Sequence, residues 1–129
     1  MIKASPVGPV KKLLIDSDPS GDSWVMINPV TYREDMARGE VLKTRVIEGS
    51  NMQSVNLYKL YAEEIWLSYN DAHIIIDDDG EELILFKPRE DMTRETFMAA
   101  LTHEKMPPPV ILEWHTRVVE VNPDWMFPF

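Results

Sequence analysis

Residues 56–86 constrain the fold most, because their hydrophobic spacing changes from that of a helix to that of strands. In the first half, apolar and aromatic residues recur at helical intervals; they are Tyr58, Tyr61, Ala62, Ile65 and Tyr69. This spacing predicts a helix with one buried stripe, and it places Glu63 and Glu64 on the solvated side.

The second half of this stretch predicts a β-hairpin. Residues 73–76 and 82–86 are short β-favouring runs, and the acidic turn between them contains Gly80, which can supply a positive φ. A calcium-binding loop is the alternative, but Gly80 at its sixth position puts Ile75 and Phe86 at the first and last ligand positions. Neither side chain offers an oxygen ligand, so a solvated turn is favoured.

Another hairpin is predicted nearer the N-terminus, over residues 12–16 and 23–28. The intervening residues 18–22 include proline and glycine, which favour a turn. Both faces of the second strand are apolar, with Trp24 and Met26 on one face and Val25 and Ile27 on the other. We therefore expect this strand to be covered on both sides.

A capping box marks the start of a further helix. Thr31 and Glu34 have the spacing at which each side chain can bond the backbone of the other, and the helix should run to about Glu48 and stop at Gly49. Its apolar stripe is thin, so one face should be solvated; the stripe consists of Tyr32, Met36, Leu42 and Val46.

Two more helices are predicted in the last third of the chain. Thr93 is a candidate N-cap for a short helix through about Glu104, which would bury Phe97, Ala100 and Leu101. Prolines at 107–109 break that helix, and the next one occupies residues 110–121. Its apolar side comprises Ile111, Trp114, Val118 and Val121.

Together these elements predict an α+β fold, with two β-hairpins and about four α-helices in one small domain over residues 12–123. Residues 1–11 hold prolines and are expected to form an extended arm. Residues 124–129 form an aromatic tail, which is unusual because chain ends are normally polar and loose. Whether the two hairpins share one sheet is left open.

Charge and composition narrow the class of protein. The 129 residues carry a net charge of −9, and the 13 basic residues are scattered. Binding to nucleic acid or to an anionic membrane surface needs clustered Lys and Arg, so neither is expected. No apolar run approaches the roughly 20 residues of a membrane-spanning helix, and the first residues do not form a signal peptide. With no cysteine either, we expect a soluble, acidic protein made in a cytoplasm.

No pattern of residues predicts catalysis, so the protein is not expected to be an enzyme, and no catalytic, cofactor-binding or metal-binding residue is assigned. The histidines, His73, His103 and His115, fall on separate predicted elements and form no zinc motif. Adjacent carboxylates such as Glu63 and Glu64 are expected by chance among 22 acidic residues. None of the five glycines lies in a phosphate-binding motif.

Both ends of the chain carry apolar residues suited to binding another protein. The predicted partner-binding residues are Pro6, Val7 and Pro9 in the arm and Trp125, Met126, Phe127 and Phe129 in the tail. Aromatic side chains dominate the energetics of protein interfaces, and burying one is worth about 1.5–3 kcal/mol. Two interpretations of the tail remain open: it folds back onto its own domain, or it docks into a neighbouring subunit or partner.

The order of features along the chain carries a resemblance. Residues 21–27, GDSWVMI, form a Gly-x-x-Trp-Val-like strand ahead of a helical body. This strand is followed in turn by residues 65–69, an acidic turn at 78–80, Leu85–Phe86, a short helix, a proline break and a final helix that ends at 121–123. In this order, over about residues 12–123, the chain resembles the tail assembly chaperones of long-tailed bacteriophages, although its aromatic tail and acidic triplet have no counterpart there.

The resemblance implies a small, non-enzymatic phage protein that acts in the host cytoplasm and binds other phage proteins, such as tail-tube and tape-measure proteins, during tail assembly. The alternative is a structural component of the virion, such as a head decoration or head–tail protein, attached to the capsid or to other copies of itself through its extended termini. An unrelated bacterial interaction module is a third hypothesis. Each implies an oligomer or a larger assembly, with no cofactor.

Overall fold

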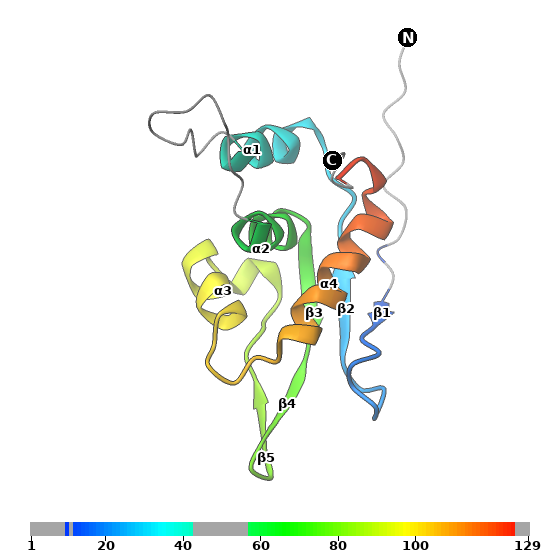
Figure 1. The fold of residues 1–129 in the computed structure, drawn as a ribbon, viewed down its shortest axis with the longest axis vertical. Helices are drawn as coiled ribbons and strands as arrows, with labels where there is room; N and C mark the ends of the chain where they lie inside the picture. The colour runs from blue at the N-terminus through cyan, green and yellow to red at the C-terminus, as the bar shows by residue number, and fades with distance from the viewer. Residues whose placement is uncertain (1–9, 11, 43–56, 126–129) are drawn as a thin grey trace.

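The computed structural model describes residues 10, 12–42 and 57–125, and it confirms the α+β fold (Figure 1). The described part of the chain contains four α-helices, a three-stranded sheet and a two-stranded sheet. In chain order the elements are β1 (Lys12–Leu14), β2 (Trp24–Ile27), α1 (Tyr32–Leu42), α2 (Leu57–Leu67), β3 (Tyr69–His73), β4 (Ile75–Asp78), β5 (Glu81–Ile84), η1 (Arg89–Asp91), α3 (Arg94–Leu101), α4 (Pro108–Val121) and η2 (Pro123–Trp125).

The N-terminal hairpin is confirmed, with β1 and β2 paired antiparallel. Its turn is held by Asp18, whose carboxylate accepts hydrogen bonds from the Ser20 N–H at 2.9 Å and from the Ser23 hydroxyl at 2.5 Å. Gly21 has φ +75°, a conformation that favours glycine. The expectation that β2 is covered on both faces is wrong: Val25 is buried, whereas Trp24 on the opposite face is only half-buried.

Strand β3 is the element that the sequence did not reveal. The predicted helix extended to Tyr69, but α2 ends at Leu67 and Tyr69 opens a strand that pairs antiparallel with β2. The strand sequence, YNDAH, contains mostly residues that are rare in strands. Pairing with β2 and burial of Tyr69 and Ala72 stabilise a conformation that local preference does not favour.

The second hairpin is also confirmed, and it forms a separate sheet, but its first strand begins at Ile75 rather than at His73, which belongs to β3. Strands β4 and β5 pair with Asp78 opposite Glu81, which leaves Asp79 and Gly80 as a two-residue turn. Both turn residues have positive φ, 52° and 88°, as a type I′ hairpin requires. The Asp77 carboxylate accepts from the Gly80 N–H at 2.8 Å, so it supports the turn. Figure 1 shows this hairpin projecting from the end of the molecule opposite α1.

The core is built around aromatic rings where α2, α3 and α4 meet the three-stranded sheet. The rings of Tyr69, Phe86, Phe97 and Trp114 have pairwise centroid separations between 4.5 and 6.5 Å. These distances and the tilted or edge-on ring planes are those of favourable aromatic pairs. None of the helices in the described part of the chain has the length and hydrophobicity needed to span a bilayer.

Helices α3 and α4 agree closely with the prediction. Thr93 caps α3, since its hydroxyl accepts from the Thr96 N–H, but the helix ends at Leu101 rather than near Glu104. Helix α4 begins at Pro108, within the proline run, where a missing N–H costs no helical bond. As expected, one face of α4 enters the core, with Trp114 and Val118 fully buried.

The predicted buried stripe of α2 is confirmed at Ile65, which is fully buried, but the prediction is wrong at both ends of the polar pattern. Tyr58 is 82% exposed, whereas the two carboxylates assigned to solvent, Glu63 and Glu64, are buried. Glu63 pairs with Arg94 of α3 at 2.6 Å, and Glu64 is paired with residues from two other helices. A buried charge is tolerated only with such partners, which come from elsewhere in the chain and are invisible to helical periodicity.

Candidate partner-binding site

Helix α1 is held at its N-terminus by the residues of the predicted capping box. The Glu34 carboxylate accepts from the Thr31 N–H at 2.9 Å and also from the Thr31 hydroxyl. The predicted bond from the Glu34 side chain back to the Thr31 N–H is therefore confirmed. The Thr31 hydroxyl, in contrast, donates to the Glu34 carboxylate rather than accepting from the Glu34 backbone. Partial burial acts to raise the pKa of Glu34, but the hydrogen bonds outweigh it and the pKa lies below its usual value.

The inner side of α1 attaches to the domain through charge. The Arg38 guanidinium meets Glu64 of α2, with 2.8 Å between Nε and Oε2. The other carboxylate oxygen lies 2.9 Å from Nε2 of His115 on α4, and the imidazole stacks on Tyr61 at a centroid distance of 3.8 Å. Glu64 is 1% exposed. One buried carboxylate therefore links three helices.

Trp125 completes the inner attachment of α1. Its indole N–H donates to the Asp35 carboxylate, its backbone carbonyl accepts from Arg38 at 3.4 Å, and the Arg38 guanidinium lies 5.7 Å from the ring centroid. The side chain is only 2% exposed. Of the two interpretations of the tail, the structure thus shows Trp125 folded back onto its own domain, where it is not accessible to a partner.

The other predicted partner-binding residues lie outside the described residues. They are Pro6, Val7 and Pro9 of the arm and Met126, Phe127 and Phe129 of the tail. The expected continuation of the first helix to Glu48, with Val46 and Gly49, lies outside them as well.

The outer side of α1 is apolar and exposed. Tyr32 and Met36, one turn apart, are 78% and 59% exposed. Both residues belong to the thin apolar stripe predicted for this helix, and the structure leaves them exposed, because Asp35 and Arg38 are the residues that bond to the rest of the domain. The helix is thus inverted relative to an ordinary surface helix, which turns its apolar side chains toward the core.

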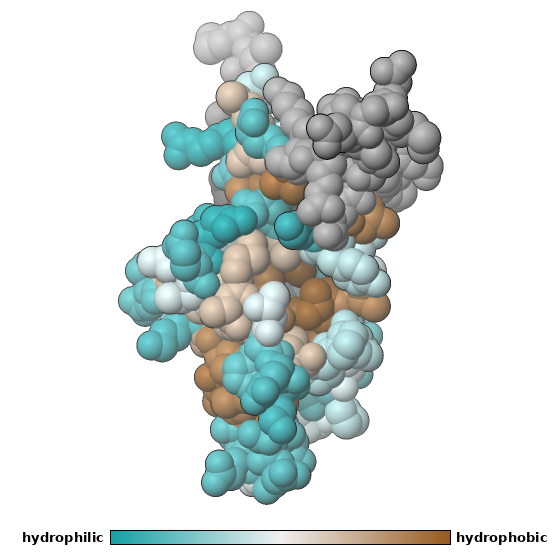
Figure 2. Space-filling model, turned by 60° about the vertical axis from the view of Figure 1, so that its left-hand side comes forward, coloured by the Kyte–Doolittle hydropathy of each residue, from teal (hydrophilic) through white to brown (hydrophobic). Residues whose placement is uncertain are grey.

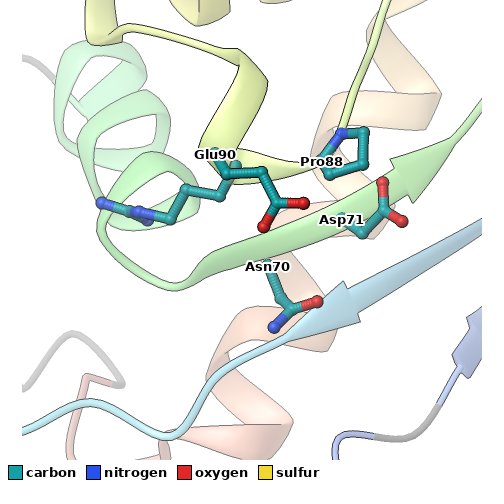
Figure 3. Close-up of a pocket in the computed structure, with 5 residues that line it drawn as sticks. Asn70, Asp71, Pro88 and Glu90 are labelled. Atoms are coloured by element: carbon teal, nitrogen blue, oxygen red, sulfur yellow. The ribbon is translucent and has the colours of Figure 1, made fainter.

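A second surface feature is an open concavity beside β3 and η1, of about 690 Å³ (Figure 3). It is lined by Asn70, Asp71, Pro88, Arg89 and Glu90. The Arg89 guanidinium donates to the carbonyls of Trp66 and Tyr69 at 2.7 and 3.0 Å and lies over the Trp66 ring. Its charge is thus committed to holding η1 against the end of α2, and burial lowers its pKa. The polar lining suits water or a polar group and brings together no nucleophile–base pair.

The three histidines have separate surroundings. His73 lies beside Trp24, His103 accepts from the Lys105 N–H at 3.1 Å, and His115 contacts Glu64. Within residues 10, 12–42 and 57–125, no group of three or more His, Asp or Glu side chains is arranged to hold a metal ion.

One end of the molecule presents a hydrophilic surface. Figure 2 shows a hydrophilic lower end, formed by the β4–β5 hairpin, and apolar patches higher on the same face. The hairpin end carries exposed carboxylates at Asp77, Asp79, Glu81 and Glu82. This end favours solvation, which leaves the region around α1 as the better candidate for protein contact.

Comparison with protein-family models, with curated proteins and with solved structures found no match to this chain. The assignment of a function therefore depends on the geometry of the molecule and on the resemblance described above.

Proposed function

We propose that the protein is a non-enzymatic bacteriophage protein that binds other phage proteins in the host cytoplasm during tail assembly. The observation that carries the proposal is the inverted helix α1, which is anchored inward by Arg38 and Glu64 and presents Tyr32 and Met36 to solvent. Exposed aromatic and methionine side chains are enriched where proteins bind one another. A helix so attached provides a contact surface without requiring the core to open.

Two further properties support the proposal. The order of elements, from the first hairpin to the final helix after a proline break, is the order on which the resemblance to tail assembly chaperones rests. The net charge of −9 favours solubility of a protein that displays apolar side chains. The proposed partners are tail-tube or tape-measure proteins; capsid proteins or other copies of the chain are the partners under the alternative, virion-component function.

Two experiments test this function. Quantitative mass spectrometry compares the amount of the chain in purified phage particles with the amount in lysates of infected cells. In the second experiment, a tagged chain is co-expressed with the tail-tube and tape-measure proteins of the same phage and purified. We expect abundance in the lysate, absence from particles, and co-purification with at least one tail protein. Many copies per particle would favour the virion component instead, and an absence of any phage encoding the chain would refute both.

A further inference from the structure

The three-stranded sheet turns one face to the core and leaves the other open. Residues that stand opposite one another in neighbouring antiparallel strands project to the same side, so the pairing of β1, β2 and β3 sorts their side chains between the two faces. Val25 and Ala72 belong to the face that enters the core. The other face, which we call the open sheet face, consists of two rows, with Lys12, Met26 and Asp71 in one and Leu14, Trp24 and His73 in the other. None of these six residues is buried.

Half of the open sheet face is apolar. Leu14 is 55% exposed, and Trp24 and Met26 on the central strand are half-buried. The solvated face of an antiparallel sheet ordinarily carries polar side chains, so three large apolar ones together are unusual there. Apolar patches that are rimmed by polar residues mark sites of protein contact.

The two edges of the open sheet face carry opposite charges. Lys12 lies at the β1 edge, where its ammonium is 4.5 Å from the centroid of the Trp24 ring and forms no ion pair with any residue that the structure describes. Asp71 lies at the β3 edge. Its carboxylate accepts from the Ala72 N–H at 2.8 Å, but that donor is neutral and leaves the negative charge uncompensated.

Other charged groups beside the face keep this polarity. Glu90 lines the concavity next to Asp71 and has no ion-pair partner within the described part of the chain (Figure 3). The two carboxylates there outnumber the single guanidinium, that of Arg89. At the β1 edge, Asp16 follows the strand but pairs with Arg117 of α4 at 3.3 Å. The face is therefore positive along β1, apolar in the middle and negative along β3.

We infer that the open sheet face binds the same face of a second copy of this chain, about a two-fold axis parallel to β2. Rotation about that axis exchanges the β1 and β3 edges, so Lys12 of each copy meets Asp71 of the other and the concavity beside it. Trp24 and Met26 then pack on their own counterparts, as the inner faces of two sheets do in a sandwich. This inference does not rest on the proposed function, which concerns binding to other proteins.

The net charge of −9 on each copy opposes this association. Exposed charges, such as those of the β4–β5 hairpin, are screened beyond about 8 Å at physiological salt, whereas charges that meet inside an interface are screened less. The open sheet face is small, and small interfaces bind weakly. We therefore expect a dimer with a dissociation constant of about 10–100 µM.

An exchange of charge between variants tests the inference. Sedimentation velocity of the full chain gives the dissociation constant, over a range from roughly 1 µM to 1 mM. Lys12→Glu and Asp71→Lys should each weaken self-association by about tenfold or more, because each places two like-charged pairs in the dimer. A mixture of the two variants should form a heterodimer, since the new glutamate at position 12 of one chain meets the new lysine at position 71 of the other, while the second pair stays native.

The heterodimer also separates binding from folding, because two variants that had failed to fold could not form it. Arg33→Glu makes the same change of charge as Lys12→Glu at an exposed site of α1, away from the sheet. This control should leave the dissociation constant unchanged.

The opposite outcomes are equally distinct. A wild-type chain that stays monomeric over the whole range overturns the inference, and so do single variants that self-associate like the wild type. A mixture that forms no heterodimer also overturns it, because the axis would then not pair position 12 with position 71. Co-purification with tail proteins that both variants retain would leave the proposed function standing, whatever the self-association shows.

Discussion

At the scale of single residues, Glu64 shows how one side chain determines where an element is attached. Its carboxylate contacts Arg38 of α1 and His115 of α4 while lying in α2. A buried ion pair adds little stability over a well-packed apolar pair, but leaving one of its charges unpaired is costly. The geometry thus specifies how α1 sits on the domain.

We expect Glu64→Ala to lower the free energy of unfolding by about 3–5 kcal/mol, because it leaves the Arg38 charge buried without its partner. Urea denaturation followed by circular dichroism measures this change. Glu120→Ala, at an exposed position of α4, is the matched control and should change stability by about 0.5 kcal/mol or less. A small loss for Glu64→Ala would show that Arg38 finds water or another acceptor when α1 relaxes.

A second residue-scale prediction concerns the pH dependence of stability. Burial acts to raise the pKa of Glu113, but hydrogen bonds from the Ser17 hydroxyl and the backbone N–H groups of Asp16 and Ser17 outweigh it and lower the pKa below its ordinary 4.5. A carboxylate with a depressed folded-state pKa stabilises the fold above its unfolded-state pKa, and the stabilisation is lost as the pH falls through the folded-state value. Stability should therefore fall as the pH decreases below about 4.5.

Acid titration of the thermal midpoint tests this dependence. Glu113→Gln should be less stable than the wild type at neutral pH and should lose less stability between neutral and acidic pH, because the titrating carboxylate is gone. Glu81→Gln, at an exposed position in the β4–β5 hairpin, should follow the wild-type curve. Parallel curves for Glu113→Gln and the wild type would refute the role of Glu113.

At the scale of elements, α1 contrasts with α4. Helix α4 buries Trp114 and Val118 in the way its apolar spacing predicts, whereas α1 exposes Tyr32 and Met36 and attaches through Asp35 and Arg38. The attachment of α1 is thus more polar than that of α4. Elements with few buried apolar contacts open at lower free energy than the core, so α1 should exchange its amide hydrogens faster than α4.

We expect Gly39→Ala to raise the free energy of unfolding by about 0.5–1 kcal/mol, through the higher helix propensity of alanine at a site where its Cβ meets no described atom. Urea denaturation again gives the measurement. Gly80→Ala provides a contrasting control, since Gly80 has φ +88° in the β4–β5 turn and alanine should destabilise that conformation. A loss of stability for Gly39→Ala would mean that the folded chain has no space for a methyl group there.

At the scale of the whole molecule, α1 and η2 together close the end of the domain opposite the projecting hairpin (Figure 1). Trp125, the last residue of η2, is buried and bonded to Asp35 of α1. The end of the described chain therefore stabilises the fold, and any contribution of the tail to partner binding must come from the residues that follow Trp125.

Two variants separate these contributions. Trp125→Ala should lower the free energy of unfolding by about 3–5 kcal/mol, the usual cost of removing a large buried aromatic side chain. A chain ending at Trp125 should keep its thermal midpoint and, if Met126, Phe127 and Phe129 bind a partner, should lose binding to the tail proteins in co-purification. Retained binding would remove those three residues from the predicted partner-binding set.

Elements whose signals are local could be predicted from the amino-acid sequence. Turn residues and strand-forming runs located both hairpins, Thr93 located the start of α3, and the prolines before α4 located the break between the two helices. Each signal depends on backbone conformation or on periodicity within a few residues, so it can be read without knowing what lies nearby in space.

The remaining features depend on contacts between residues that are far apart in the chain. Strand β3 exists because β2 offers it a partner, and the YNDAH sequence does not favour a strand alone. The burial of Glu63 and Glu64 depends on Arg94, Arg38 and His115, which lie between 26 and 51 positions away in the chain. Hydrophobic periodicity treats every carboxylate as solvated, whereas a folded protein can bury one wherever distant residues supply its charge partners. The same distant pairing turned α1 so that its apolar face, the candidate binding surface, points to solvent.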